Sequence, residues 1–339
     1  MTIDFRSDTV THPTPGMLET MMAAKVGDDV FGEDEAVNAL EAFAEHLFGM
    51  EAGIFCASGT MTNQIAIKCH TQPADEVICE GQSHIYQYEA GGIAFNSGCQ
   101  VELIDGNRGR ITADEISAAI NPGDIHKAPS RLVSLENTSN RGGGSCYDIR
   151  EIEKISELCN REKLRLHLDG ARLFNALVAR NETPVAYGKL FNSISICLSK
   201  GLGAPVGSVL LGKTDFIQKA RRIRKIMGGG MRQAGYLAAA GLYALQHHVN
   251  RLSEDQLHAQ QIAEILRMQD FVKSVMPVET NIIIFEVNPS YTAAEITEKL
   301  KEKGVLVYAI SVNRVRMVLH LDITASMVAH TCSILTGLK

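Results

Sequence analysis

Short apolar runs alternate with longer amphipathic segments through the middle of the chain. Between residues 51 and 212 the runs are short enough for strands, and most segments between them are long enough for a crossover helix. The expected strands are 53–56, 76–79, 100–104, 131–135, 164–168, 193–198 and 208–211. The last connection is too short for a crossover helix, so its two strands should be antiparallel. The pattern predicts an α/β fold with a mostly parallel seven-stranded sheet in a large domain.

Beyond residue 231 the pattern changes to two long helical stretches, which end near His247 and Met268. The rest of the chain has the pattern strand, helix, strand, strand, helix. The strands expected there are 282–287, 305–309 and 316–319. We therefore predict a large domain over 1–249, which includes the N-terminal arm, and a small C-terminal α/β domain over 250–339.

Two of the expected helices begin with a capping box, in which a threonine is followed three residues later by a glutamate. Thr112 pairs with Glu115 in the first, and Thr292 with Glu295 in the second. These signals predict helix starts at 113 and 293.

Composition narrows the possible partners and the compartment. The 339 residues are 45% hydrophobic and 21% charged, and the net charge of −6 disfavours a nucleic-acid or anionic-membrane surface. The first residues, MTIDFRSDTV, lack the apolar core of a signal peptide, and the longest apolar stretch, 236–245, is too short for a membrane span. We expect a cytoplasmic protein without nucleic-acid or membrane partners.

The eight cysteines lie mostly inside apolar runs and form no C-x-x-C pair, so we expect reduced thiols. The histidines lack the spacing of a zinc site, and we predict no metal.

Polar residues follow several of the predicted strands. The carboxyl ends of parallel strands meet at one edge of a sheet, where ligands bind. The residues at these ends are Ser58, Gly59, Thr60, His84, Glu136, Asp169, Arg172 and Lys200. Lys200 can form a Schiff base, and Asp169 can hold a pyridine nitrogen protonated. With Ser58-Gly59-Thr60 as a phosphate cradle at a helix N-terminus, these are the groups that pyridoxal phosphate requires.

Each of these residues also has a structural interpretation. Asp169 could cap a helix, Lys200 could end a strand in solvent, and Ser58 could form an ordinary turn. Their coincidence at one sheet edge favours the cofactor site. A dinucleotide site is disfavoured because the glycines of 201–207 have the wrong spacing, enclose Pro205, and precede a strand rather than a helix.

Eight segments of the chain, in the same order, resemble the low-specificity L-threonine aldolases. They are RSDTVT at 6–11, VFGEDE at 30–35, SGTMTNQ at 58–64, SHIYQYEAGG at 83–92, LENTSN at 135–140, HLDGARLFNA at 167–176, LSKGLGAPVGS at 198–208 and GGGMRQAG at 228–235. The resemblance implies a pyridoxal-phosphate enzyme of fold type I. It also implies a lyase that cleaves L-threonine or L-allo-threonine to glycine and an aldehyde.

The resemblance assigns roles around the cofactor. Lys200 would carry it, Asp169 would pair with its ring nitrogen, and His84 would stack on its ring. Ser58, Gly59 and Thr60 would hold its phosphate. Arg232 would reach the phosphate of a neighbouring subunit, so the resemblance implies a homodimer with shared active sites, assembled into a homotetramer.

Further residues would bind the substrate. Arg172 would contact both cofactor and substrate, and would hold the substrate carboxylate together with Ser7 and Arg316. Arg314 is an alternative to Arg316 for binding the substrate carboxylate, because the alternation of side chains along a strand places both on the same face. The remaining residues implied in the pocket are Phe31, Tyr88, Lys225 and His126, of which His126 would lie near the substrate hydroxyl. Either His84 or His126 is then the candidate base.

This chain departs from the family pattern in three places. Phe31 stands where the family commonly has tyrosine, Ser139 where it has histidine, and Leu319 where it often has threonine. The alternatives are another pyridoxal-phosphate reaction, such as β-elimination from an aromatic amino acid, serine hydroxymethyl transfer or transamination, and a non-catalytic paralogue that binds the cofactor.

Overall fold

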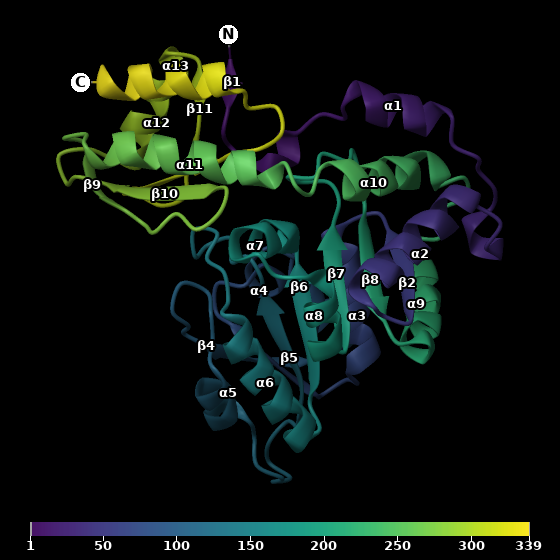
Figure 1. Ribbon diagram of the computed structural model, residues 1–339. Coiled ribbons are helices and arrows are strands. Elements are labelled where there is room, and N and C mark those ends of the chain that lie inside the picture. The colour runs from purple at the N-terminus through teal and green to yellow at the C-terminus, as the bar shows by residue number, and fades with distance from the viewer. Residues whose placement is uncertain (1, 339) are drawn as a thin grey trace.

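The computed structural model describes residues 2–338, and a seven-stranded sheet forms its centre (Figure 1). The strand order is β2-β8-β7-β6-β5-β3-β4. The bounds are β2 Ala52–Cys56, β3 Glu76–Glu80, β4 Gln100–Ile104, β5 Ser130–Glu136, β6 Arg165–Gly170, β7 Ser193–Cys197 and β8 Ser208–Gly212. All seven predicted strands are therefore confirmed, with small shifts at their ends.

Strand β8 is antiparallel to both of its neighbours, β7 and β2, as the short connection predicted for the first pair. The other pairs are parallel. Two reversals restore the direction, so β2 points the same way as β7. The carboxyl ends of β2, β3, β5, β6 and β7 consequently lie at one edge of the sheet.

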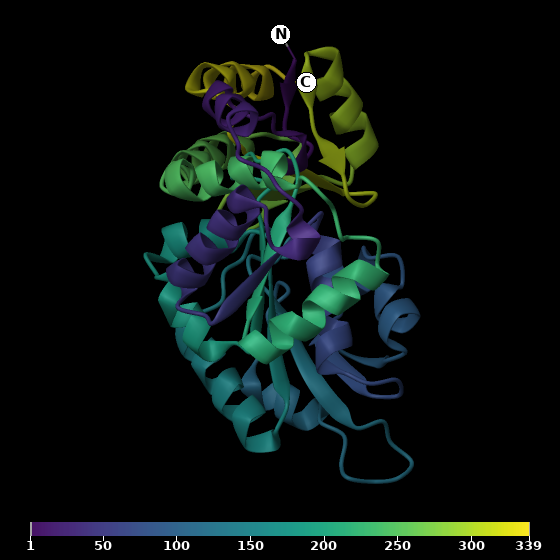
Figure 2. The same cartoon turned by 90° about the vertical axis from the view of Figure 1, so that its right-hand side faces the viewer.

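Helices cover both faces of this sheet (Figure 2). On one face lie α2 Glu35–Phe48, α5 Ala113–Ala119, α6 Ile149–Glu162, α7 Leu173–Arg180, α8 Pro184–Leu190 and α10 Gly235–His247. On the other lie α3 Gly59–His70, α4 His84–Gln87, η3 Ile93–Ser97 and α9 Thr214–Ile226. Alternate residues of each strand serve the two faces: Phe55 packs with the first set and Ile54 with the second.

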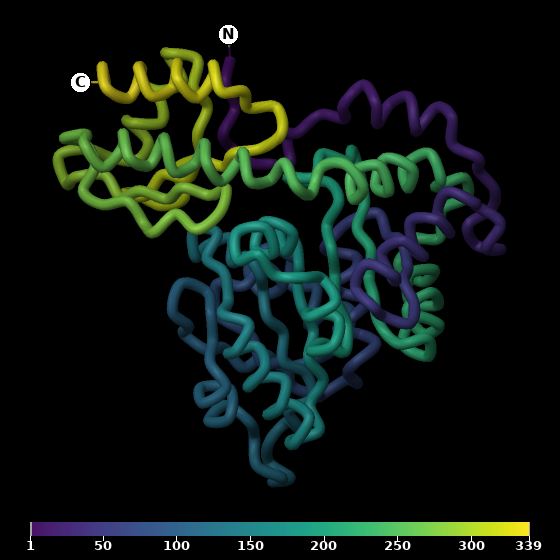
Figure 3. The backbone as a smooth tube through the Cα atoms, in the orientation of Figure 1, coloured from purple at the N-terminus to yellow at the C-terminus, as the bar shows by residue number. Residues whose placement is uncertain are grey.

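The N-terminal segment runs along the outside of the molecule before it enters the large sheet (Figures 1 and 3). Its elements are β1 Ile3–Asp4, η1 Asp8–Val10, α1 Pro15–Met22 and η2 Asp29–Phe31. Helix α1 packs against α10, and Met17 belongs to the core of the large sheet.

The C-terminal part forms a four-stranded antiparallel sheet in the order β12-β13-β10-β9. Its elements are α11 Leu252–Arg267, β9 Val272–Val275, β10 Ile282–Val287, α12 Ala293–Glu302, β11 Val305–Leu306, β12 Tyr308–Ala309, β13 Arg314–Val318 and α13 Ala325–Thr336. Strand β9 was not expected, because its residues are largely exposed and lack an apolar run. The expected strand 305–309 is two strands, β11 and β12, which belong to different sheets.

The first strand connects the two ends of the chain. Strand β1 pairs in parallel with β11, and Ile3 and Phe5 lie in the C-terminal hydrophobic core. The N-terminal arm, which we assigned to the large domain, thus contributes its first residues to the core of the smaller part. The boundary near residue 250 stays a prediction.

Several local predictions are confirmed. Both capping boxes are present, at Thr112 with Glu115 and at Thr292 with Glu295. All eight cysteines are free, and six of them are buried. In the part of the chain that the structure describes, no helix combines the length and apolarity needed to cross a membrane.

Candidate active site

A cavity of about 310 Å³ opens where the carboxyl edge of the large sheet faces the C-terminal sheet. Its lining residues are Ser7, Thr9, His84, Tyr88, Asn140, Arg141, Arg172, Lys200, Tyr308, Ile310 and Arg316. Six residues predicted for the site therefore line one cavity, although they are far apart in the sequence. They are Ser7, His84, Tyr88, Arg172, Lys200 and Arg316. No group of residues 2–338 forms a hydrogen bond or ion pair with the Lys200 amine.

Asp169 is the second-last residue of strand β6 and is only 3% exposed. Its Oδ2 accepts a hydrogen bond from Asn63 Nδ2 at 3.0 Å, and its Oδ1 accepts one from the Ala171 backbone at 3.1 Å. Both donors are neutral, so they fix the carboxylate without cancelling its charge. The group is available to a cationic partner in the site.

His84 begins α4 beside a group of buried acids. Its Nδ1 lies 3.0 Å from Glu89 Oε1, and its backbone N–H donates to Glu136 Oε2 at 2.7 Å. Burial opposes protonation of His84, but the hydrogen bond to Glu89 and the charge of Asp169 outweigh it and raise the pKa. Lys200 acts in the opposite direction on the same pKa, so Asp169, Lys200 and His84 share one electrostatic environment. Burial and the charge of Asp169 raise the pKa of Glu136 to about 7.

Possible metal ligands occur together at His84, Glu89 and Asp169, whose donor atoms lie within 4.8 Å of one another. The two amide hydrogens of Asn63 point at Glu89 Oε1, at 2.9 Å, and at Asp169 Oδ2, at 3.0 Å. The amide thus accounts for the close approach of the two carboxylates.

Arg172 is buried against Asp8 in a two-pronged ion pair. Its Nε and Nη2 donate to the two carboxylate oxygens at 2.6 and 2.7 Å. Burial opposes the ionisation of Asp8, but the Arg172 guanidinium lowers the pKa of that carboxyl below its usual value. Two of the three Arg172 nitrogens, Nε and Nη2, are therefore engaged with Asp8, and Nη1 is left for a ligand.

Arg316 lies on β13 at the cavity wall, whereas Arg314 lines a neighbouring hollow with Gln82 and Gln87. The Arg316 Nη1 donates to Asn140 Oδ1 at 2.8 Å, while its Nε is buried without a hydrogen-bond partner. Burial and repulsion by Arg172 lower the pKa of Arg316 to about 10, so it is charged at neutral pH. An unpaired, buried N–H on a cation is suited to an anionic ligand.

The predicted phosphate cradle lies at the start of α3. Ser58 caps this helix, with Oγ accepting from Met61 N at 3.2 Å, so its structural interpretation also holds. The amides of Gly59 and Thr60 precede the first intrahelical bonds and carry the positive end of the helix dipole. Ser208 Oγ is buried without a partner, 3.6 Å from the point that a Cβ on Gly59 would occupy. Unused amides beside an orphaned hydroxyl fit a phosphate group.

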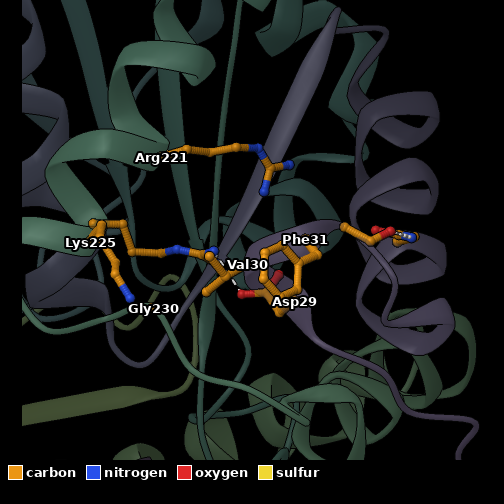
Figure 4. Close-up of a pocket in the computed structure, with 9 residues that line it drawn as sticks. Asp29, Val30, Phe31, Arg221, Lys225 and Gly230 are labelled. Atoms are coloured by element: carbon orange, nitrogen blue, oxygen red, sulfur yellow. Dashed lines mark hydrogen bonds and ion pairs between the residues drawn. The ribbon is translucent and has the colours of Figure 1, made fainter.

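A second pocket, of about 350 Å³, contains two of the other predicted residues (Figure 4). Phe31, which is 72% exposed, and Lys225 line it together with Asp29 and Arg221, and Arg232 pairs nearby with Asp28 at 2.8 Å. None of these residues lines the Lys200 cavity.

His126 does not line the Lys200 cavity either. It is exposed in a loop, where its Nδ1 lies 2.8 Å from Asp124. A single chain therefore does not bring Phe31, Lys225, Arg232 or His126 to Lys200.

The chain matches the family model described as Beta-eliminating lyase over residues 4–290. It is 44% identical over 332 residues to a low specificity L-threonine aldolase of Escherichia coli K12, covering 98% of this chain and 97% of the relative. A low-specificity L-threonine aldolase of Arabidopsis thaliana is 40% identical over 338 residues, covering 98% and 94%. This chain belongs to the low-specificity L-threonine aldolase family. It is a lyase.

Solved structures agree on the fold. A Leishmania major threonine aldolase aligns with a TM-score of 0.87 at 21% identity, covering 99% of both chains. A Sphingomonas wittichii serine palmitoyltransferase aligns with a TM-score of 0.79 at 14% identity, covering 99% of this chain and 87% of the other. These likenesses place the aldolase-family chain in fold type I, as the resemblance implied.

Four site residues lacked a predicted role. Asp8, Asn63 and Glu89 lie inside the family segments quoted above, and Glu136 was named only as following a strand. Their roles as partners of Arg172, Asp169 and His84 arise from contacts between segments far apart in sequence. A motif marks such a residue but does not identify its partner.

Proposed function

We propose that this member of the aldolase family cleaves L-threonine and L-allo-threonine to glycine and an aldehyde, with pyridoxal phosphate held by Lys200. The observation that carries the proposal is the pairing, at one sheet edge, of an unengaged lysine amine with a buried carboxylate held only by neutral donors. This combination provides an attachment point and a partner for a protonated ring nitrogen.

The residues of the chain would hold the cofactor at three points. Lys200 would bind its carbonyl carbon, Asp169 its ring nitrogen, and the start of α3 its phosphate, next to the orphaned Ser208 hydroxyl. When bound, pyridoxal phosphate supplies an electron sink for the bond that breaks. His84 would lie against the ring, oriented by Glu89.

Substrate binding would rest on Arg316, whose buried Nε lacks a partner, assisted by Arg172 Nη1 and Ser7. A clamped carboxylate fixes the orientation of the Cα–Cβ bond in the site. His84 Nδ1 is engaged with Glu89, so Nε2 is free to take the proton of the β-hydroxyl. Because the pKa of His84 is raised, kcat/KM should increase as pH rises through it.

The second pocket supports a shared site in a homodimer, and we extend this proposal to a homotetramer in the cytoplasm. Phe31, Lys225 and Arg232 belong to the family segments but lie apart from Lys200 within one chain. In a dimer they would complete the cavity of the neighbouring subunit, with Arg232 released from Asp28 to meet the phosphate.

Aldehyde release from L-threonine and L-allo-threonine in parallel tests the function. Purified protein is supplied with pyridoxal phosphate, and Lys200→Ala serves as the control. Release by the parent alone is expected, and the ratio of the two rates gives the diastereomer preference. Release of pyruvate and ammonia from an aromatic amino acid would instead assign β-elimination, and bound cofactor without turnover would assign a non-catalytic role.

A further inference from the structure

A continuous chain of hydrogen bonds leads from Asp169 along the α3 face of the sheet toward its opposite edge. Asn63 Nδ2 lies 3.0 Å from Asp169 Oδ2, and Asn63 Oδ1 lies 3.2 Å from His167 Nε2. His167 Nδ1 lies 2.8 Å from Ser193 Oγ, which lies 2.8 Å from His70 Nε2. Asn63, His167 and Ser193 are each at most 1% exposed.

The direction of every bond follows from the chemistry of Asn63. Its amide nitrogen faces two carboxylates, Glu89 and Asp169, so both amide hydrogens are used there. Its carbonyl oxygen is left for His167, and Nε2 of that ring must therefore carry a hydrogen.

The remaining bonds are then fixed in turn. Burial lowers the pKa of His167 to about 4, so the ring is neutral and its Nδ1 can only accept. The Ser193 hydroxyl donates to that nitrogen, and its oxygen then accepts from His70 Nε2. In this series of hydrogen bonds, every donor thus points toward Asp169.

His70, at the far end of this hydrogen-bond chain from Asp169, is held in place by packing. The His70 ring stacks on Phe216 with centroids 4.5 Å apart. It lines a polar cavity of about 320 Å³ with Arg165, Lys213 and Lys219, beside the amino ends of β6 and β7.

This chain of hydrogen bonds fixes the positions of two buried carboxylates in the site. Glu89 Oε1 and Asp169 Oδ2 both accept a hydrogen, and the two hydrogens come from the same amide. The Asn63 amide supplies those hydrogens, and His167 prevents the amide from turning over.

We propose that His167, Ser193 and His70 are positioning residues that act through Asn63 to hold the Asp169 carboxylate in place, aimed at the cofactor nitrogen. The inference rests on the cofactor placement proposed above. It predicts that the effect of substitution on the ring nitrogen and on kcat decreases with distance from Asp169, being largest at Asn63 and His167, smaller at Ser193 and smallest at His70.

The test uses holoenzyme reconstituted with pyridoxal phosphate labelled with ¹⁵N in the ring. His167→Leu removes the donor to Asn63, whereas His167→Gln can present an amide N–H near the position of Nε2. In the parent and His167→Gln, the ring nitrogen should have the ¹⁵N shift of the protonated form. In His167→Leu the shift should move toward the unprotonated form and kcat should fall roughly tenfold, with KM little changed.

A matched control separates positioning from loss of packing. Tyr147→Phe removes another buried polar contact, from Ile111 N to the Tyr147 hydroxyl at 2.9 Å, in the core on the opposite face of the sheet. It should lower the melting temperature without moving the ¹⁵N shift. An unchanged shift and kcat in His167→Leu would overturn the inference while leaving the proposed function intact. A parent that takes up no cofactor would contradict both.

Discussion

The Lys200 cavity and the Phe31 pocket each contain a buried ion pair, Arg172 with Asp8 in the first and Arg224 with Asp29 in the second, but they differ in what surrounds that pair. In the Lys200 cavity the buried ion pair of Arg172 with Asp8 and the network on Asp169 are complete within one chain. In the Phe31 pocket a large aromatic ring is 72% exposed beside cationic side chains (Figure 4). The sheet edge gathers the groups proposed to hold the cofactor, whereas the pocket presents an exposed aromatic ring of the kind found at interfaces.

The largest expected effect comes from removing one partner of the buried ion pair in the Lys200 cavity. Arg172→Leu leaves Asp8 buried and uncompensated, because the two side chains are only 5% and 0% exposed. The free energy of unfolding should fall by about 3–5 kcal/mol in urea denaturation. The double variant Asp8→Leu with Arg172→Leu should recover much of this loss, and equal stabilities of single and double variants would argue against a coupled pair.

Arg316 tests the binding half of the same cavity. Arg316→Ala should raise KM for L-threonine by about tenfold to a hundredfold, as expected for a charge-assisted hydrogen bond to the substrate carboxylate. Arg314→Ala is the matched control on the same strand and should leave KM near the parent value. Steady-state kinetics on both variants give the two KM values. A larger increase in KM for Arg314→Ala would assign the substrate carboxylate to Arg314 instead of Arg316.

The interface character of the second pocket is tested at Phe31. Phe31→Asp should change the unfolding free energy of the chain by about 0.5 kcal/mol or less, since the ring is exposed. Dilution followed by analytical ultracentrifugation should instead show weaker self-association. Phe95→Asp, at a phenylalanine that is 91% exposed, provides the comparison. A similar weakening by both substitutions would deny Phe31 a specific role.

Glu136 gives a pH-dependent effect on stability beside His84. Its pKa is raised from 4.5 to about 7 on folding, so the folded state binds its proton more tightly. The stability from this group is present below about pH 4.5 and is lost as pH rises toward 7. The unfolding free energy of the parent minus that of Glu136→Gln should therefore decrease over this interval. A difference that is flat or increases with pH would contradict the raised pKa.

The sequence predicted the large sheet well, because each buried strand is a local apolar run bounded by turns. The antiparallel β8 followed from the length of one connection. Strand β9 and the division of 305–309 into β11 and β12 could not be predicted, since they depend on which distant strand each segment pairs with.

The same distinction holds in the site. Lys200 and Asp169 were found because their positions at strand ends are local features. Asp8 as the partner of Arg172, and Asn63 as the partner of Asp169, are separated from those residues by 164 and 106 positions. No spacing rule connects residues at such separations.

Reductive trapping tests the central claim most directly. The protein is incubated with pyridoxal phosphate, treated with borohydride and digested, and the modified lysine is located by mass spectrometry. The account predicts modification of Lys200, at the carboxyl edge of the large sheet, and its loss in Lys200→Ala. Modification of Lys225 in the second pocket, or of no lysine at all, would contradict it.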